Sequence, residues 1–144
     1  MNTFSDLQAT EFDLDLRLQV RAIGQPRLKI SINQDTVYHG ILTHTFDLSH
    51  RLPLLQPVAV MIELLDKDYN SAQETAAVIE QLSIDQFELV PAWTQLATYI
   101  NDHQYTDPTN YLGFVGTWQL LIDRPFYQWA HAVTNQGMLL QIDQ

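Results

Sequence analysis

The stretch EFDLDLRLQVRA, residues 11 to 22, decides the fold class of this chain. Apolar side chains occupy every second position, and charged or polar side chains fill the positions between them. The apolar set is Phe12, Leu14, Leu16, Leu18, Val20 and Ala22. A period of two over this length indicates a β-strand with one buried face and one face in water, because a helix would mix the two sets on every side.

Further short segments of the same kind follow, separated by turns rich in Gly, Pro and Asn. Their ranges are 27–34, 36–39, 43–48, 57–65, 111–122, 126–133 and 138–143. The segment 57–65 is apolar on both faces, which predicts a central strand covered on both sides. Segment 77–90 fits a helix in part, but its β-branched residues favour a strand whose register slips at a bulge.

This pattern predicts an all-β fold, an antiparallel two-sheet β-sandwich (jelly-roll-like), with a barrel as the alternative. The 144 residues suit a single domain over 1–144, with residues 1–10 as an N-terminal arm. A short helix or loop insertion is expected around 91–110, because Trp93, Leu96 and Ile100 form one apolar stripe at helical spacing.

Composition excludes several classes of protein. The net charge of −10 disfavours nucleic acid as a partner. The chain has no cysteine, so it forms no disulfide and no thiolate zinc site. No apolar run is long enough for a membrane helix, and the N-terminus has no basic cluster of the kind that opens a signal peptide. We therefore expect neither membrane insertion nor export by a standard route.

The sharpest candidate metal site is the pattern Asp66-x-Asp68-x-Asn70, three oxygen-bearing side chains at alternate positions of a loop. Such a pattern can open a calcium loop. The positions that follow lack the glycine and the glutamate of an EF-hand. A looser calcium site, helped by Glu74 or Asp47, is one reading, and a solvated turn is the other.

No catalytic constellation is apparent, so we expect a protein that is not an enzyme. The histidines lack the spacing of a zinc pair on a helix. The sequence contains no G-x-S-x-G motif and no glycine-rich phosphate loop. The acids lie mostly at outward positions, where a general acid is poorly supported.

The stretch NYLGFVGTWQLLIDRPFYQW, residues 110–129, concentrates aromatic side chains. Alternation places Trp118 in the core, with Gly116 leaving room for a large neighbour or a bulge. Tyr111, Tyr127 and Trp129 are candidates for exposed rings that stack on a sugar or enter a pocket of a protein partner. The alternative is that these three are ordinary core or scattered surface aromatics.

Two resemblances follow from these segments. FDLDLRLQVRAIGQPRLKISINQDTVYHG (12–40), THTFDL (43–48) and PVAVMIELLDKD (57–68) resemble the first strands of β-sandwiches of the carbohydrate-binding-module type. The aromatic stretch 110–129 is similar to strands in small β-sandwich accessory proteins, decoration or tail proteins, of tailed phages.

The phage resemblance implies a virion component, a capsid decoration or tail accessory protein, made in the host cytoplasm. Its partners would be other virion proteins, either further copies of itself or a capsid or tail protein. The other resemblance implies a calcium-assisted carbohydrate-binding module. Its surface glycan would be held by Tyr127, Trp129 and the Asp66–Asn70 loop.

Overall fold

The computed structural model describes residues 13–53, 56–85, 87–89, 96–103, 110–123 and 129–130. These residues are nearly all β, as the alternation predicts. The strands are β1 (Asp13–Ile23), β2 (Arg27–Ile32), β3 (Asp35–Ile41), β4 (Phe46–Pro53), β5 (Val58–Asp66), β6 (Ala76–Ile84), β7 (Phe87–Glu88), β8 (Thr98–Asn101), β9 (Tyr111–Leu112) and β10 (Gly116–Ile122). Within this part of the chain, no helix is long and apolar enough to cross a membrane.

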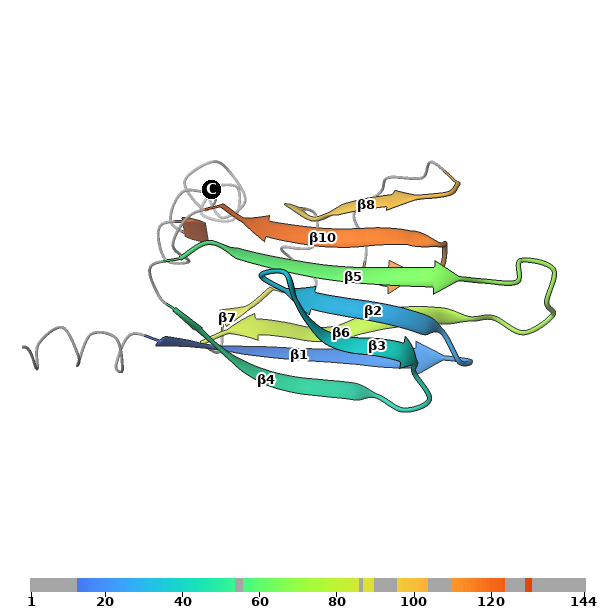
Figure 1. Cartoon of the computed structure of the whole chain (residues 1–144), viewed down its shortest axis with the longest axis horizontal. Coiled ribbons are helices and arrows are strands. Elements are labelled where there is room, and N and C mark those ends of the chain that lie inside the picture. Colours follow the sequence, from blue (N-terminus) through green and yellow to red (C-terminus); the bar gives the residue numbers. More distant parts are fainter. Residues whose placement is uncertain are drawn as a thin grey trace, which may run out of the picture.

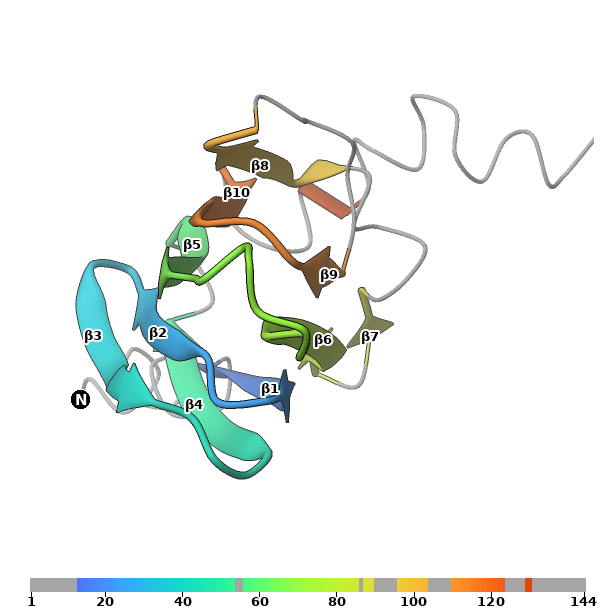
Figure 2. The ribbon, with the colours of Figure 1, turned by 90° about the vertical axis from the view of Figure 1, so that its right-hand side faces the viewer.

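The strands form two antiparallel sheets packed face to face (Figure 1). Sheet A has the order β4-β1-β6-β7, with β9 pairing β6 beyond the reach of β7. Sheet B has the order β3-β2-β5-β10-β8. The view along the strands separates the two layers, with the core between them (Figure 2). The predicted two-sheet sandwich is confirmed.

Strand β1 behaves as the opening stretch predicts. Its apolar positions Leu14, Leu16, Leu18 and Val20 are all buried in the core. β1 lies in the middle of sheet A, paired with β4 on one side and with β6 on the other. The positions between the apolar ones therefore form a stripe along the outer face of sheet A.

Strand β5 holds the centre of sheet B. It pairs with β2 on one side and β10 on the other, so its predicted central place is confirmed. One face, Val58 to Leu64 at alternate positions, is buried in the core. The other face is only half-buried, so the predicted cover on both sides is not complete.

Strand β10 carries the predicted core tryptophan. Trp118 is fully buried and is the largest such side chain among the described residues. Gly116 lies where β10 meets β8. A Cβ at Gly116 would lie 2.3 Å from the carbonyl oxygen of Ile100 and 2.5 Å from Cα of Asn101. The room that Gly116 leaves is taken by the backbone of the neighbouring strand.

The slip predicted in segment 77–90 falls between Ile84 and Phe87, and the structure has a turn there. β6 ends at Ile84, and a tight turn at Asp85, with a φ of 51°, leads into β7, where Phe87 pairs with Ile84. This is a hairpin turn and not a bulge. A register shift does occur within β6, because Gln19 of β1 pairs with Gln81 while Val20 pairs with Ile79. Glu80 is thus the extra residue of a bulge.

Two local predictions are wrong. Residues 98–101 form strand β8 at the edge of sheet B, and Ile100 is 71% exposed, so the apolar stripe on a helix does not exist there. Residues 129 and 130 are helical, so the strand predicted over 126–133 is wrong where the structure describes it. The predicted arm 1–10, Trp93 and the segment 138–143 lie outside the described residues.

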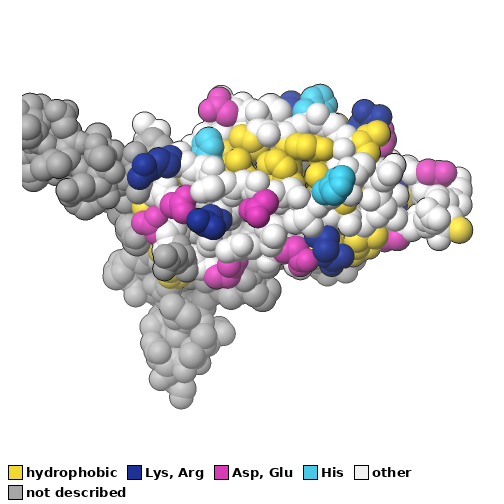
Figure 3. Space-filling view, turned by 90° about the horizontal axis from the view of Figure 1, so that it is seen from below, with side chains coloured by type: hydrophobic (Ala, Val, Ile, Leu, Met, Phe, Trp, Pro, Cys, Tyr) yellow, Lys and Arg dark blue, Asp and Glu magenta, His cyan; other side chains and the backbone are white. Residues whose placement is uncertain are grey.

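Edge strands β3 and β4 lie on one side of the sandwich (Figure 1). The rings of Tyr38 and Phe46 contact each other there, with their centroids 5.3 Å apart. Seen from this side, a band of hydrophobic side chains runs across the surface between histidines (Figure 3). Because Tyr38 and Phe46 pack against the core and are only partly exposed, they form the rim of the core.

Candidate functional site

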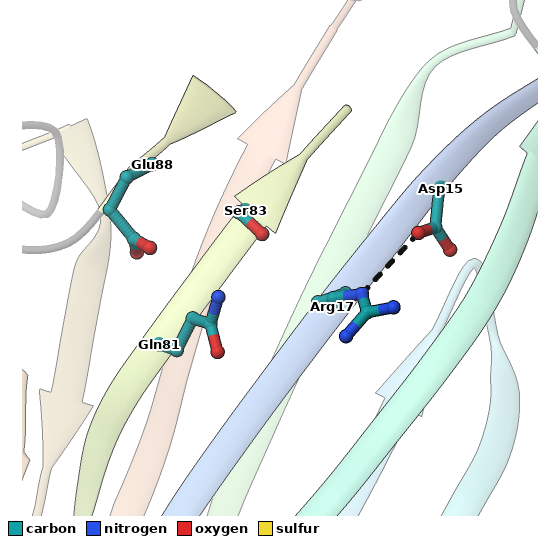
Figure 4. A pocket seen from close by; sticks show the side chains of 5 residues that line it. All are labelled: Asp15, Arg17, Gln81, Ser83 and Glu88. Atoms are coloured by element: carbon teal, nitrogen blue, oxygen red, sulfur yellow. Dashed lines mark hydrogen bonds and ion pairs between the residues drawn. The ribbon is translucent and has the colours of Figure 1, made fainter. Parts of the chain in front are cut away.

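The outer face of sheet A contains a polar hollow of about 350 Å³. We call it the A-sheet hollow. Among the residues that the structure describes, the ones that line it are Asp15, Arg17, Gln81, Ser83 and Glu88. Figure 4 shows that they come from three neighbouring strands, β1, β6 and β7. All five side chains are polar or charged, and they combine hydrogen-bond donors with acceptors.

Strand register brings these residues together. Arg17 of β1 pairs with Ser83 of β6, and Ser83 pairs with Glu88 of β7, so the three form one row across the sheet. Gln81 lies two residues before Ser83 on the same face. Because paired residues in antiparallel strands share a side of the sheet, these side chains all belong to the outer face, where Ser83 is buried at the floor of the hollow with 3% of its surface exposed.

The charges in the hollow are partly engaged with one another. Nε of Arg17 lies 3.4 Å from Oδ2 of Asp15, and the two side chains are 63% and 48% exposed. Ser49 donates its hydroxyl proton to Oδ1 of Asp15 at 3.0 Å. The amide of Leu82 donates to Oε2 of Glu88 at 3.1 Å. An ion pair this exposed contributes little stability, so its groups can exchange partners at low cost.

Tyr111 lies further along the same outer face. Arg21 of β1 pairs with Val78 of β6, and Val78 pairs with Tyr111 of β9. The Tyr111 ring is therefore on the same side of sheet A as the hollow, and the residue is 40% exposed. This confirms the outward position that alternation predicts for Tyr111. Its role in binding stays a prediction.

The hydroxyl of Tyr111 is fixed by a short chain of partners. It donates to Oε2 of Glu74 at 2.7 Å, and Nζ of Lys67 donates to Oε1 of Glu74 at 2.6 Å. Nζ also donates to the carbonyl of Gly113 at 2.7 Å. The hydrogen bonds from Lys67 and Tyr111 lower the pKa of Glu74. Burial and the hydrogen bond to Glu74 raise the pKa of Tyr111 to about 12, so its hydroxyl stays protonated and donating at neutral pH.

The other aromatic candidates differ from Tyr111. Trp129 is 5% exposed and belongs to the core cluster, so the prediction that its ring is exposed is wrong. The physical reason is that its segment is helical at residue 129, and the alternation of a strand does not apply. Tyr127 lies outside the described residues.

The Asp66–Asn70 triad does not present a ready cation site. Asp66 pairs with Arg27, with 3.2 Å between Oδ2 and Nε. Asp68 accepts the amide of Asn70 at 2.9 Å, which is the bond of a turn. Among the residues that the structure describes, no group of three or more histidine, aspartate or glutamate side chains is arranged to hold a metal. Calcium binding at the triad stays a prediction.

A second polar cluster joins the loop after β5, the loop after β8 and the segment before β10 in sheet B. The hydroxyl of Tyr69 lies 2.8 Å from both carboxylate oxygens of Asp102, and the amide of Val115 donates to it at 2.8 Å. Nδ1 of His103 lies 2.7 Å from Oδ1 of Asp102, and the His103 ring stacks on Phe114. The hydrogen bonds from His103 and then Tyr69 lower the pKa of Asp102. Because these polar groups satisfy one another, the cluster holds the loops in place.

Comparisons with known proteins leave the family open. No protein-family model and no curated protein matches the chain. One similar solved structure is described as vCBM60 in complex with galactobiose. It is 10% identical, the match covers 76% of this chain and 97% of that chain, and the TM-score is 0.48.

Another similar structure is the selenomethionine form of vCBM60, described as part of a link by circular permutation between two families of calcium-dependent carbohydrate-binding modules. It is 12% identical, the match covers 74% of this chain and 89% of that chain, and the TM-score is 0.49. At these values the matches carry no argument about ligand or metal. The function has to be inferred from the residues of this chain.

Sequence reasoning found Tyr111 but missed the A-sheet hollow. Each lining residue stands at an outward position of a predicted strand, so its place on the outer face could be predicted, although Ser83 is only 3% exposed. The pairing of Arg17 with Ser83 and of Ser83 with Glu88 could not, because it depends on which strands are neighbours and on the turn at Asp85. A polar stripe on two adjacent strands is the signal that could have pointed to it.

Proposed function

We propose that this chain is a non-catalytic binding domain that takes a hydroxyl-rich ligand, a glycan, in the A-sheet hollow. The observation that carries the proposal is the hollow itself: about 350 Å³, with five polar side chains from three adjacent strands as the described part of its lining. A volume of this order is that of a small-molecule site. A rigid sheet beneath the site favours specific recognition, because its side chains need little reordering when a ligand binds.

The chemistry of the lining supports a polyhydroxy ligand. Each hydroxyl of a sugar donates one hydrogen bond and accepts others. The guanidinium of Arg17 supplies donors only, the carboxylates of Asp15 and Glu88 supply acceptors only, and the amide of Gln81 and the hydroxyl of Ser83 supply both. An apolar ligand would displace water from these groups without replacing the hydrogen bonds of that water, which is costly.

The positions of the carboxylates favour binding over hydrolysis. Asp15 is half exposed to water and accepts the Ser49 hydroxyl. Glu88 is exposed and accepts the backbone amide of Leu82. A general acid in glycoside cleavage needs a carboxyl group that holds its proton, usually because it is sheltered from water. Neither acid has that setting.

The test is a titration of the full chain with neutral oligosaccharides, in which NMR or calorimetry measures the binding. We expect saturable binding that Arg17→Ala and Gln81→Ala each weaken. The matched control is Lys29→Ala, a charge removal on the outer face of sheet B, which should leave affinity unchanged. Binding that Lys29→Ala and Arg17→Ala weaken equally would contradict the hollow as the site, and no binding to any glycan would contradict the function.

Two finer roles from the sequence stay proposals. The first is calcium assistance. The same titration in the presence of a calcium chelator tests it, because a chelator lowers the affinity for the glycan only if calcium assists binding. The second is a structural role in a tailed-phage virion, which recovery of the chain from purified particles at a fixed copy ratio would support.

A further inference from the structure

We infer that the ligand of the A-sheet hollow is an extended neutral oligosaccharide that also stacks on the Tyr111 ring. This inference rests on the proposed function and adds a second contact point to it. The two points are the polar hollow at one end of the outer face of sheet A and the exposed aromatic ring further along that face. A ligand that reaches both must be longer than a single sugar ring.

The spacing follows from the register. The hollow is centred on the row of Arg17, Ser83 and Glu88, and Tyr111 lies in the row of Arg21 and Val78. Arg21 lies four positions after Arg17 in β1, a distance of roughly 13 Å at the usual rise of an extended strand. β7 and β9 both flank β6 on the edge away from β1. Glu88 and Tyr111 therefore stand in line along one side of β6.

The described side chains between the two points are mostly polar, with Val78 as an apolar and nearly buried exception. Gln19 pairs with Gln81 in the row between them, and their side chains are only partly buried on the outer face. Next come Arg21 and the bulge residue Glu80, whose exposed side chains form an ion pair with 2.7 Å between Nε and Oε1. Amide and charged groups in this order can bond the hydroxyls of a chain that lies along the sheet.

The Tyr111 ring is held in a set orientation. A Cβ at Gly113 would lie 2.9 Å from Cε1 of the ring, so the ring lies against the backbone at a residue that has no side chain. Its hydroxyl is bound to Glu74. A ring that is fixed before binding loses little freedom when it stacks on the apolar face of a sugar, and this favours affinity.

Lys67 is a positioning residue for this ring. Its side chain is 8% exposed, and its ammonium group is bound by Glu74 and by the carbonyl of Gly113. It therefore fixes both the acid that binds the Tyr111 hydroxyl and the backbone segment that supports the ring. Because Lys67 is buried beneath this arrangement, it acts on the ligand through Glu74 and Tyr111 and not by contact.

The charges on this face favour a neutral chain. The exposed carboxylates of Asp15, Glu80 and Glu88 outnumber the guanidinium groups of Arg17 and Arg21 along the path. The whole chain carries a net charge of −10. A sulfated or uronate-rich glycan would be repelled by this field, whereas a neutral glycan is not affected by it.

The experiment is a chain-length series from monosaccharide to hexasaccharide of a neutral glycan that the wild-type chain binds, measured by calorimetry. We expect affinity to rise with length until the ligand reaches Tyr111. Tyr111→Ala should then weaken binding of the long ligands about five- to tenfold and leave the monosaccharide unchanged. Glu74→Gln and Gly113→Ala, which release or displace the ring, should give a smaller loss confined to the long ligands.

Ile100→Ala, an exposed apolar truncation on sheet B, is the control and should leave every affinity unchanged. A merely structural defect in the Glu74 or Gly113 variant would weaken short and long ligands alike and would contradict the positioning of the ring by Glu74, and with it the role of Lys67, which acts through Glu74. Equal affinity for all lengths, with Tyr111→Ala silent, would overturn the inference while leaving the hollow as the site. A loss in Tyr111→Ala with Arg17→Ala silent would instead overturn the hollow.

Discussion

Replacing Gly116 by alanine should destabilise the fold through a backbone clash. The added Cβ would lie 2.3 Å from the carbonyl oxygen of Ile100, whereas ordinary contacts begin near 3.4 Å, so β8 and β10 must separate by about 1 Å. A neighbouring side chain could rotate away, but this oxygen belongs to the β8 backbone. Overpacking of this kind costs roughly 1–3 kcal/mol, and the rigid partner argues for the upper half of that range.

The measurement is urea denaturation of Gly116→Ala with hydrogen exchange along β8. A loss of about 2–3 kcal/mol corresponds to a fall in Tm of roughly 4–12 °C for a chain of this size. β8 pairs only with β10 among the described strands, so its amides should lose protection first. Thr117→Ala, on the outer face one residue along, is the matched control. Stability within about 0.5 kcal/mol of wild type would refute the close approach of the two strands.

Other perturbations test the core and the loop network. Trp118→Ala and Trp129→Ala should both lower the free energy of unfolding, Trp118→Ala by roughly 3–5 kcal/mol, because both side chains are buried. A Trp129→Ala variant with the wild-type free energy of unfolding in urea would support the exposed Trp129 ring predicted from the sequence. Glu74→Gln should be less stable than wild type at neutral pH. Because the folded-state pKa of Glu74 lies below its unfolded value, that difference should shrink as pH falls below about 4, and a difference constant with pH would contradict the network. Tyr69→Phe should cost roughly 0.5–1.5 kcal/mol by removing the hydroxyl that bonds Asp102, and a chemical-denaturation curve that superimposes on wild type would show that the hydroxyl ties no loops.

The strands that are easiest to predict are those with one dry and one wet face. In β1 the alternation of Leu14, Leu16 and Leu18 with polar residues marks both the strand and its buried side, and Trp118 follows from the same rule in β10. The apolar character of β5 on both faces predicts its central place. These features depend on local spacing alone, which is why the sequence is sufficient for them.

Features that depend on pairing between strands far apart in the sequence could not be predicted from local spacing. Leu96 and Ile100 imitate a helical stripe, but Ile100 lies on an edge strand because β10 supplies a partner to residues 98–101. A strand over 126–133 would expose Trp129, but the chain is helical at residue 129 and the side chain is buried. The A-sheet hollow requires β1 to pair with β6, and the residues Arg17 and Ser83 are far apart in the sequence.

The central position of β1 in sheet A affects how the chain folds as it leaves the ribosome. β1 is synthesised before all the other described strands, but its neighbours are β4 and β6, which end at Pro53 and Ile84. At roughly 5–20 residues per second, about 3 to 12 seconds pass between the synthesis of Ile23 and that of Ile84. During that interval a nascent β1 exposes an apolar face and at least one unpaired edge. Fragments that end before β6 should therefore aggregate or require a chaperone, whereas fragments that include β6 can pair both edges of β1.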